Sequence, residues 1–233
     1  MALEKRLVVT RSDDSQNEMA RITHPIIREY SDKCEADFMI LSDNLGYKSS
    51  HYRILKLYDL FEEYDRILSL DTDILILKSC PNIFDVVPKD CIGTIFEDVG
   101  SRQQDRRNRI RMVQEKFGDV EWKSGYINTG VALFPRESRI IFGRKPENEL
   151  WNGLGYDDVW LGYMIRKYKL EIFELDPIWN FMSMFSEPWN MNKSRFEAHI
   201  IHYAGAGAFH PQCKNRMEIM KEDFLTLRKY GFI

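Results

Sequence analysis

Short apolar runs alternate along the chain with segments whose hydrophobic residues recur at helical spacing. The runs predict strands, and a spacing such as that of Ile54, Leu57 and Phe61 predicts a helix. The expected strands are 6–10, 37–41, 66–70, 92–96, 131–134, 171–175 and 199–203. The expected helices are 18–33, which contains Pro25, 51–64, 157–167 and 215–230. Alternation of this kind predicts an α/β fold with a largely parallel sheet flanked by helices.

Size and composition are those of an ordinary globular chain. Its 233 residues suffice for one substantial core, and no repeat or linker divides them, so a single domain over 1–233 is expected. Segment 143–155 contains Gly, Pro and Asn and predicts a surface loop. A net charge of −3 gives no general attraction to nucleic acid or to an anionic membrane, so no nucleic-acid partner is expected.

Targeting signals and cysteine usage indicate the cellular compartment in which the protein is expected. No run approaches the roughly 18 apolar residues of a transmembrane helix, and the stretch 7–9 is too short for the core of a signal peptide. The four cysteines form no CxxC pair, which predicts free thiols in a reducing compartment. We therefore expect a cytoplasmic protein with no transmembrane segment, and a peripheral membrane contact stays open.

The central chemical signal is a pair of acidic residues, Asp71 and Asp73, that follows the expected strand 66–70. Residues two apart on an extended chain point to the same side, and strand carboxyl ends are where α/β sheets bind ligands. Paired carboxylates there suit Mg²⁺ or Mn²⁺, which in turn bind diphosphate oxygens. A solvated turn is the alternative, but the apolar run 67–77 around the acids disfavours it, because burying unpaired charge is costly.

A second signal follows the expected strand 199–203, where His202 precedes Gly205 and Gly207. Closely spaced glycines allow backbone N–H groups to approach a phosphate. The imidazole of His202 would complete a metal site begun by Asp71 and Asp73. A purely structural histidine is the alternative.

Two polar interruptions complete the set of candidates. Asn128, Thr129 and Gly130 break an apolar strand and would place an amide and a backbone near a sugar, unless the break is a β-bulge. Asp157 and Asp158 begin an expected helix, where they either cap it or contact sugar hydroxyls.

Taken together and in this order, these segments resemble the family 8 glycosyltransferases, the group of glycogenin and the bacterial lipopolysaccharide galactosyltransferases. The resemblance runs from about Tyr52 to Lys214. It implies a GT-A fold, with a Rossmann-like, mostly parallel sheet, and a nucleotide-sugar donor, with a UDP-sugar favoured. It further implies Mn²⁺ or Mg²⁺ as cofactor, retention of anomeric configuration, and a glycan, protein or lipid-linked acceptor.

The resemblance also assigns roles to residues. Asp71 and Asp73 look like the family's metal motif, with His202 as a further ligand. Asp157 would be the sugar-binding acid near the reaction centre, with Asp158 beside it as the second catalytic candidate. The implied donor-binding residues are Thr10, Arg11, Arg53, Thr72, Asn128, Gly130, Gly205, Gly207 and Lys214. The segment 179–182 matches a further family segment.

Three departures from the family pattern stand out. The family often follows its metal-binding His with Lys-Pro-Trp, whose Lys grips the diphosphate, whereas residues 206–209 intervene here and leave Lys214 as the candidate. Asp158 replaces the usual Gln, which affects the expected donor or acceptor preference. Arg53 stands about one residue out of register with the family's upstream basic residue, and Lys56 competes with it.

Other functions fit the pattern less well. A sugar-phosphate nucleotidyltransferase would carry a glycine-rich loop after its first strand, and residues 10–15 contain no glycine. A phosphatase with an Asp-x-Asp nucleophile would have a small turn residue where Ile74 stands. A non-catalytic sugar-nucleotide-binding module stays open, and product turnover would distinguish it from an enzyme.

The segment 101–116 carries a cluster of arginines with few acids. The cluster consists of Arg102, Arg106, Arg107, Arg109 and Arg111. It predicts a mobile lid or an acceptor-facing segment that meets a phosphate or an acidic acceptor. A solvated helical face is the alternative.

Overall fold

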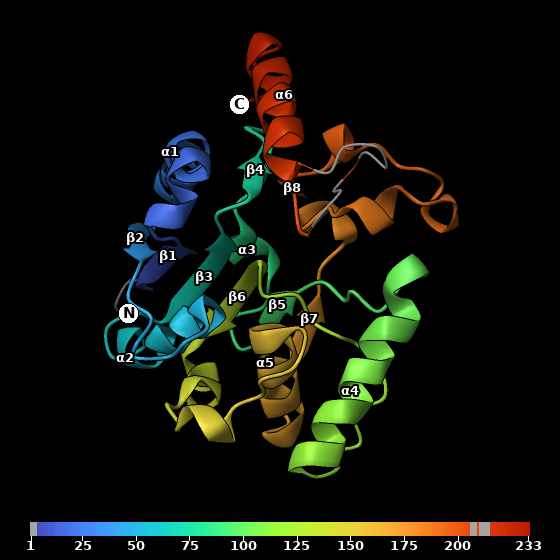
Figure 1. The fold of residues 1–233 in the computed structure, drawn as a ribbon. Coiled ribbons are helices and arrows are strands. Elements are labelled where there is room, and N and C mark those ends of the chain that lie inside the picture. The colour runs from blue at the N-terminus through green and yellow to red at the C-terminus, as the bar shows by residue number, and fades with distance from the viewer. Residues whose placement is uncertain (1–3, 206–208, 210–214) are drawn as a thin grey trace.

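A six-stranded sheet forms the centre of the computed structural model, which describes residues 4–205, 209 and 215–233 (Figure 1). Its strands are β1 (Arg6–Arg11), β2 (Asp37–Leu41), β3 (Arg66–Asp71), β5 (Ile92–Thr94), β6 (Val131–Pro135) and β7 (Ile172–Glu174). They lie in the order β2-β1-β3-β6-β5-β7, and β6 alone of these six runs antiparallel to its neighbours. The α/β class with a mostly parallel sheet is therefore confirmed.

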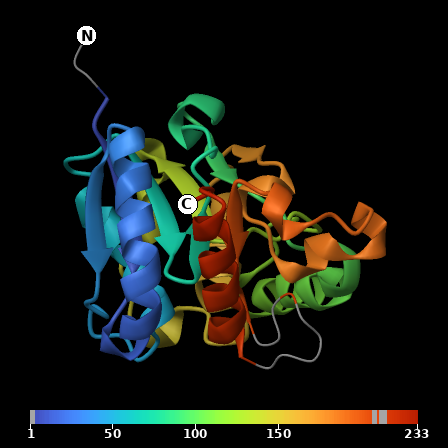
Figure 2. The same cartoon turned by 90° about the horizontal axis from the view of Figure 1, so that it is seen from above.

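Successive strand residues point to opposite faces of the sheet, and each face is covered by helices. Val8 and Leu68 pack into one core with α1 (Asn17–Lys33) and α6 (Arg216–Lys229). Leu7 and Ile67 pack into the other core with α2 (Leu57–Leu60), α4 (Gln103–Phe117) and α5 (Tyr156–Lys167). Figure 2 shows α1 and α6 side by side, where Lys221 pairs with Glu18. Both faces of the sheet are therefore buried in hydrophobic cores.

One expected helix with an internal proline is confirmed, and another turns out differently. Helix α1 continues through Pro25, because its stripe of Met19, Thr23, Ile27 and Tyr30 is buried against the sheet. The expected helix 51–64 is instead a 3₁₀ segment, Ser50–Lys56, followed by the four-residue α2. Residues 52–55 are all buried, so this segment is enclosed on several sides rather than packed along one stripe.

A small second sheet positions the residues of interest. Strand β4 (Ile74–Ile76) runs antiparallel to β8 (Ile200–His202), with Ile74 opposite His202. The backbone N–H of Tyr203 donates to the carbonyl of Asp73 at 2.9 Å, which extends this ladder by one bond. The ladder brings the carboxyl end of β8 to the end of β3. A short helix, α3 (Ile83–Val86), follows β4.

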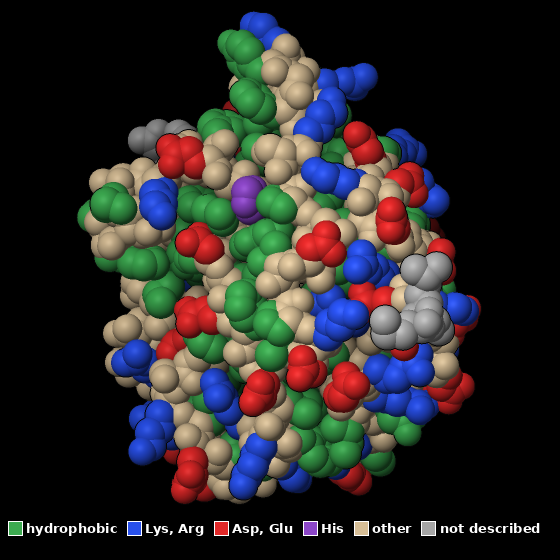
Figure 3. Space-filling model, turned by 180° about the vertical axis from the view of Figure 1, so that it is seen from behind, with side chains coloured by type: hydrophobic (Ala, Val, Ile, Leu, Met, Phe, Trp, Pro, Cys, Tyr) green, Lys and Arg blue, Asp and Glu red, His purple; other side chains and the backbone are tan. Residues whose placement is uncertain are grey.

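The surface carries charges of both signs. Figure 3 shows acidic and basic side chains interspersed with hydrophobic ones over one face of the molecule. Within residues 4–205, 209 and 215–233, no helix is long and apolar enough to cross a membrane. The described cysteines, Cys34, Cys80 and Cys91, are free thiols, and Cys213 lies outside the described residues.

Candidate active site

A cavity of about 300 Å³ opens where β1 and β3 end and the β4–β8 ladder begins. Most of the residues predicted from the sequence line it. They are Arg11, Arg53, Asp71, Thr72, Asp73, Asn128, Asp157, Asp158, His202 and Gly205. Residues more than 190 positions apart in the chain therefore meet at one place, which agrees with the rule that α/β sheets bind ligands at strand carboxyl ends.

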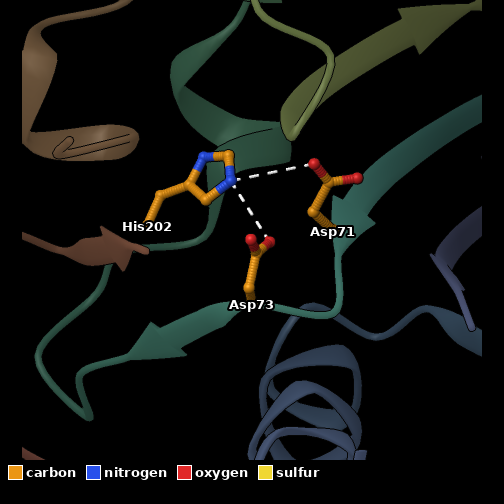
Figure 4. Close-up of side chains that lie close together, drawn as sticks. All are labelled: Asp71, Asp73 and His202. Atoms are coloured by element: carbon orange, nitrogen blue, oxygen red, sulfur yellow. Dashed lines mark ion pairs between the residues drawn. The ribbon is translucent and has the colours of Figure 1, made fainter. Parts of the chain in front are cut away.

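Asp71, Asp73 and His202 converge on one point of the cavity wall (Figure 4). Their ligand atoms all lie within 4.8 Å of one another. The Nε2 atom of His202 is 3.7 Å from Oδ2 of Asp71 and 3.2 Å from Oδ1 of Asp73. Asp71 ends β3 and Asp73 directly precedes β4, so the chain turns between the two sheets with both carboxylates on the cavity side.

These residues fit a divalent metal ion. Nε2 of His202 is buried and has no hydrogen-bond partner, as a nitrogen kept for a ligand would be. Gly130 leaves the space open, because a Cβ there would lie 2.3 Å from Cε1 of His202 and 2.9 Å from Oδ2 of Asp71. Two carboxylate oxygens and one imidazole nitrogen are a donor set that suits Mn²⁺, Mg²⁺ or a similar ion.

An arginine holds the outer oxygen of each carboxylate. Arg11 donates to Oδ1 of Asp71, and Arg216 donates to Oδ2 of Asp73 at 2.6 Å. The other oxygen of each acid is the one that faces His202. Burial alone would raise the pKa of Asp73, but His202 and Arg216 outweigh it and lower that pKa to about 2. Each acid thus turns its other oxygen toward Nε2 of His202.

Asp157 and Asp158 point out from the first turn of α5 into the same cavity. Asp157 accepts a hydrogen bond from Arg11 and lies 3.3 Å from Nδ1 of His51. Asp158 accepts from the backbone N–H of Thr129 at 2.8 Å. The N-cap of α5 is Gly155, and no side chain caps it. The hydrogen bonds and ion pairs of both acids therefore lead away from the helix end, which does not fit the capping alternative.

The two adjacent acids differ in charge. Burial alone would raise the pKa of Asp157, but the charge of Arg11 and the hydrogen bond from His51 hold that pKa well below its usual range. Burial and the charges of Asp157 and Glu97 raise the pKa of Asp158 to about 7. Near neutral pH, Asp157 is thus ionised while Asp158 carries a proton for much of the time.

Comparison with known proteins places this site in a family. Residues 8–139 match the family model described as glycosyl transferase family 8. The chain belongs to this family. The match spans β1 to β6 and includes Asp71 and Asp73. The chain is therefore a glycosyltransferase of family 8.

Solved structures show the same GT-A-like fold. A glycosyltransferase involved in the glycosylation of the major capsid of PBCV-1 has a TM-score of 0.59 and 16% identity, over 94% of this chain and 99% of that one. The galactosyltransferase LgtC has a TM-score of 0.60 and 16% identity, over 94% and 95%. Mouse xyloside xylosyltransferase 1 has a TM-score of 0.51 and 13% identity, over 86% and 97%. No curated protein matches the chain.

The remaining donor-binding candidates of this family 8 chain are distributed around the cavity. Arg53 is buried and donates to Asn44 and Asp13. Thr72 donates to the backbone carbonyl of Arg11 at 2.7 Å. Gly205 lines the cavity with a φ of +80°, a left-handed conformation that favours glycine.

Two described donor-binding candidates, Thr10 and Gly130, are not among the cavity-lining residues. Thr10 is buried behind Thr72, 3.4 Å from its hydroxyl, and Gly130 lies behind the metal ligands. Gly207 and Lys214 lie outside the described residues. The donor-binding roles of all these residues stay predictions.

Several cavity residues were given no catalytic, metal-binding or donor-binding role from the sequence, although Thr129 stands in the polar interruption and Arg102 and Arg106 in the basic segment described there. They are Gln16, Ser50, His51, Glu97, Arg102, Arg106, Thr129, Ala204 and Arg216. Glu97 follows the expected strand 92–96 directly, as Asp71 follows its own strand, so the same rule would have indicated it. His51 and Arg216 have no comparable signal, because they stand inside or at the start of helical segments.

The basic segment forms helix α4, whose Ile110 and Val113 are buried. Arg102 and Arg106 leave its N-terminal end toward the cavity, and both donate to the buried carboxylate of Glu97. The alternative of a fully solvated face therefore does not describe these two side chains. A lid motion of 101–116 stays a prediction.

Proposed function

We propose that this family 8 enzyme transfers a hexose from a nucleoside-diphosphate sugar, with UDP-sugars preferred, to a hydroxyl of a glycan, protein or lipid-linked acceptor. The observation that carries the proposal is the convergence of Asp71, Asp73 and His202 on a cavity that Asp157 also lines. The galactosyltransferase LgtC, whose structure was solved with donor and acceptor sugar analogs, has a similar fold.

Asp71, Asp73 and His202 would hold Mn²⁺ or Mg²⁺. When bound, the ion would offset the charge that builds up on the leaving nucleoside diphosphate. Arg53 and the backbone N–H of Gly205 line the same cavity and are suited to bind phosphate oxygens. Arg11 keeps one metal ligand, Asp71, and the sugar-side acid, Asp157, at a fixed spacing.

At the sugar, Asp157 would accept hydrogen bonds from donor hydroxyls and stabilise positive charge at the anomeric carbon, while Asn128 supplies an amide on the same wall. We propose retention of configuration, as the family resemblance implies, so that no dedicated base is required. Should the enzyme invert instead, Asp157 and Asp158 are the candidate bases.

A thermal-shift series with UDP, GDP and their sugars, with and without Mn²⁺, tests donor and metal together. A ligand that binds only the folded state stabilises it by about 2.7 kcal/mol at a hundredfold excess over Kd. We expect UDP to raise the melting temperature most when Mn²⁺ is present. Asp73→Asn should fold and lose the metal-dependent part of the shift. If no nucleoside diphosphate shifts the melting temperature with or without metal, the proposal is wrong.

A further inference from the structure

A continuous line of buried polar side chains leads away from His202. Nδ1 of His202 lies 2.8 Å from Oδ1 of Asn180, whose Nδ2 donates to Oδ1 of Asn128 at 2.8 Å. Nδ2 of Asn128 then donates to Oε2 of Glu97 at 3.3 Å. The exposed fractions of these four residues lie between 0% and 6%, so the line is shielded from water. Each member is therefore restricted to the partners that the protein provides.

A backbone group fixes the direction of this line. The N–H of Gly130 donates to the side chain of Asn128 at 2.9 Å, and a backbone N–H can only donate. The atom of Asn128 at that position is therefore the carbonyl oxygen. Asn180 must turn its NH₂ group toward that oxygen, and its own Oδ1 toward His202.

The tautomer of His202 follows from the same reasoning. Because Oδ1 of Asn180 can only accept, Nδ1 of a neutral His202 carries the ring proton. The lone pair then lies on Nε2, which faces Asp71 and Asp73 and has no hydrogen-bond partner. Nε2 is thereby left able to bind a metal ion.

Asn180 is held rigidly beside β8. The N–H of Phe181 donates to the carbonyl of Ile200 at 2.9 Å, and the N–H of His202 donates to the carbonyl of Phe181 at 3.0 Å. These two bonds attach the backbone next to Asn180 to the strand that carries His202. The amide of Asn180 is fully buried. Its position relative to the imidazole is thus set by main-chain bonds.

We propose that Asn180 is a positioning residue of the metal site: it fixes the ring orientation and tautomer of His202 so that Nε2 is the ligand atom. Through Asn128 it also links this ligand to the wall of the cavity assigned to the donor sugar. The proposal rests on the proposed function, since it concerns the metal that function requires. Partners of this kind typically contribute roughly 10- to 100-fold to metal affinity.

The tautomer can be measured without any turnover. Long-range ¹H–¹⁵N NMR of the metal-free protein at alkaline pH, where His202 is neutral, distinguishes a proton on Nδ1 from one on Nε2. His202→Gln identifies the signal by its disappearance. We expect the Nδ1–H form in the wild type, and an Nε2–H form would overturn the proposal.

Mn²⁺ affinity, measured by the EPR signal of free ion, tests the consequence. Asn180→Leu keeps the volume and removes both hydrogen bonds, so we expect Mn²⁺ affinity to fall roughly 10- to 100-fold. Asn180→Asp keeps an acceptor for Nδ1–H but loses the donor to Asn128, so its Mn²⁺ affinity should fall less than that of Asn180→Leu. Ser138→Ala is the control, since Ser138 is a buried hydroxyl that donates to Pro135 at 2.6 Å, away from the cavity.

The outcomes separate the two proposals. Wild-type protein without Mn²⁺ affinity contradicts the proposed function and this inference with it. Normal wild-type binding together with unchanged binding by Asn180→Leu contradicts only the role of Asn180. If Asn180→Leu does not fold, the NMR signals of the wild type and of Asn180→Asp decide: an Nε2–H form in either protein counts against the proposal.

Discussion

Asp157 is the residue on which the proposed chemistry depends most. Its carboxylate is ionised and accepts a hydrogen bond from Arg11, and under the proposed function it would stabilise charge that appears only in the transition state. We predict that Asp157→Asn lowers kcat for donor hydrolysis by roughly 100- to 1000-fold, about 2.7–4 kcal/mol, while donor affinity changes little. Steady-state hydrolysis and a UDP titration on the same variant measure both. Normal hydrolysis with a lowered melting temperature would make Asp157 a structural residue.

Asp158 should make the folded protein less stable as pH rises, whereas acids with a lowered pKa make it more stable. Its pKa rises to about 7 in the folded protein, so between its unfolded value and pH 7 the folded state holds a proton that the unfolded state has released. Stability should therefore fall as pH rises through this window, by at most about 1.4 kcal/mol per pH unit.

Replacing Asp158 with asparagine should remove this contribution to the pH dependence of stability. We predict that Asp158→Asn is more stable than the wild type at pH 8 and that this advantage is clearly smaller at pH 5, because Asn keeps an oxygen for the N–H of Thr129 without the charge. Urea unfolding at both pH values measures the difference. A variant that is equally destabilised at both would show that the charge of Asp158 is not the cause.

Single residues of the site were predictable where chemistry and position agreed. Asp71, Asp73 and Asp157 are acids at the edge of apolar or helical segments, and His202 precedes glycines. Asn180 was noticed only as part of a family segment, without a role. Its function depends on a hydrogen bond to a residue 22 positions away, which no local pattern encodes.

The turn that enters β6 passes close behind the metal ligands. A Cβ on Gly130 would lie 2.3 Å from Cε1 of His202, 2.9 Å from Oδ1 of Asn128 and 2.9 Å from Oδ2 of Asp71. We predict that Gly130→Ala displaces these groups, costs about 1–3 kcal/mol of stability and abolishes the Mn²⁺-dependent thermal shift. Gly143→Ala is the control, since its Cβ would meet only Ile140 O at 3.4 Å. Equal thermal shifts for both variants would contradict this.

Helix α4 is attached to the site through one buried acid. Glu97 accepts from both Arg102 and Arg106, so Glu97→Gln removes the buried counter-charge of both and leaves Arg106 only its pair with the exposed Asp105. We predict a loss of roughly 3–5 kcal/mol in the free energy of unfolding and faster trypsin cleavage in 101–116. The exposed pair of Glu115 and Arg111 offers the control, and Glu115→Gln should cost less than about 1 kcal/mol.

The predicted lid, 101–116, contains most of helix α4. If 101–116 closes over bound substrate, donor and Mn²⁺ together should protect it from trypsin more than they protect other exposed sites. Equal cleavage of the segment with and without donor would count against a lid.

At the level of elements, the hydrophobic pattern predicted the strands of the main sheet and also β8, but neither β4 nor its pairing with β8 in a second sheet. The run 67–77 is apolar on both sides of Asp71 and Asp73, and only long-range pairing makes β3 and β4 members of different sheets. The register that sets His202 opposite Ile74 is likewise a tertiary property. The assembly of the metal site could therefore be expected from the family resemblance, not from local patterns.

At the scale of the whole molecule, the described residues that line the cavity include equal numbers of basic and acidic side chains. Among the described lining residues are five arginines and five acids. The arginines are Arg11, Arg53, Arg102, Arg106 and Arg216, and the acids are Asp71, Asp73, Glu97, Asp157 and Asp158. A divalent ion and a diphosphate would enter this cavity with charges that offset each other, which favours their binding as a pair.

Release of nucleoside diphosphate from a panel of sugar nucleotides, with Mn²⁺ or with chelator, tests the central claim most directly. The account predicts that at least one UDP-sugar yields UDP, that chelator stops the release, and that Asp73→Asn folds but releases none. Failure of the wild type to release a nucleoside diphosphate from any sugar nucleotide, or equal release by the wild type and Asp73→Asn, would contradict it.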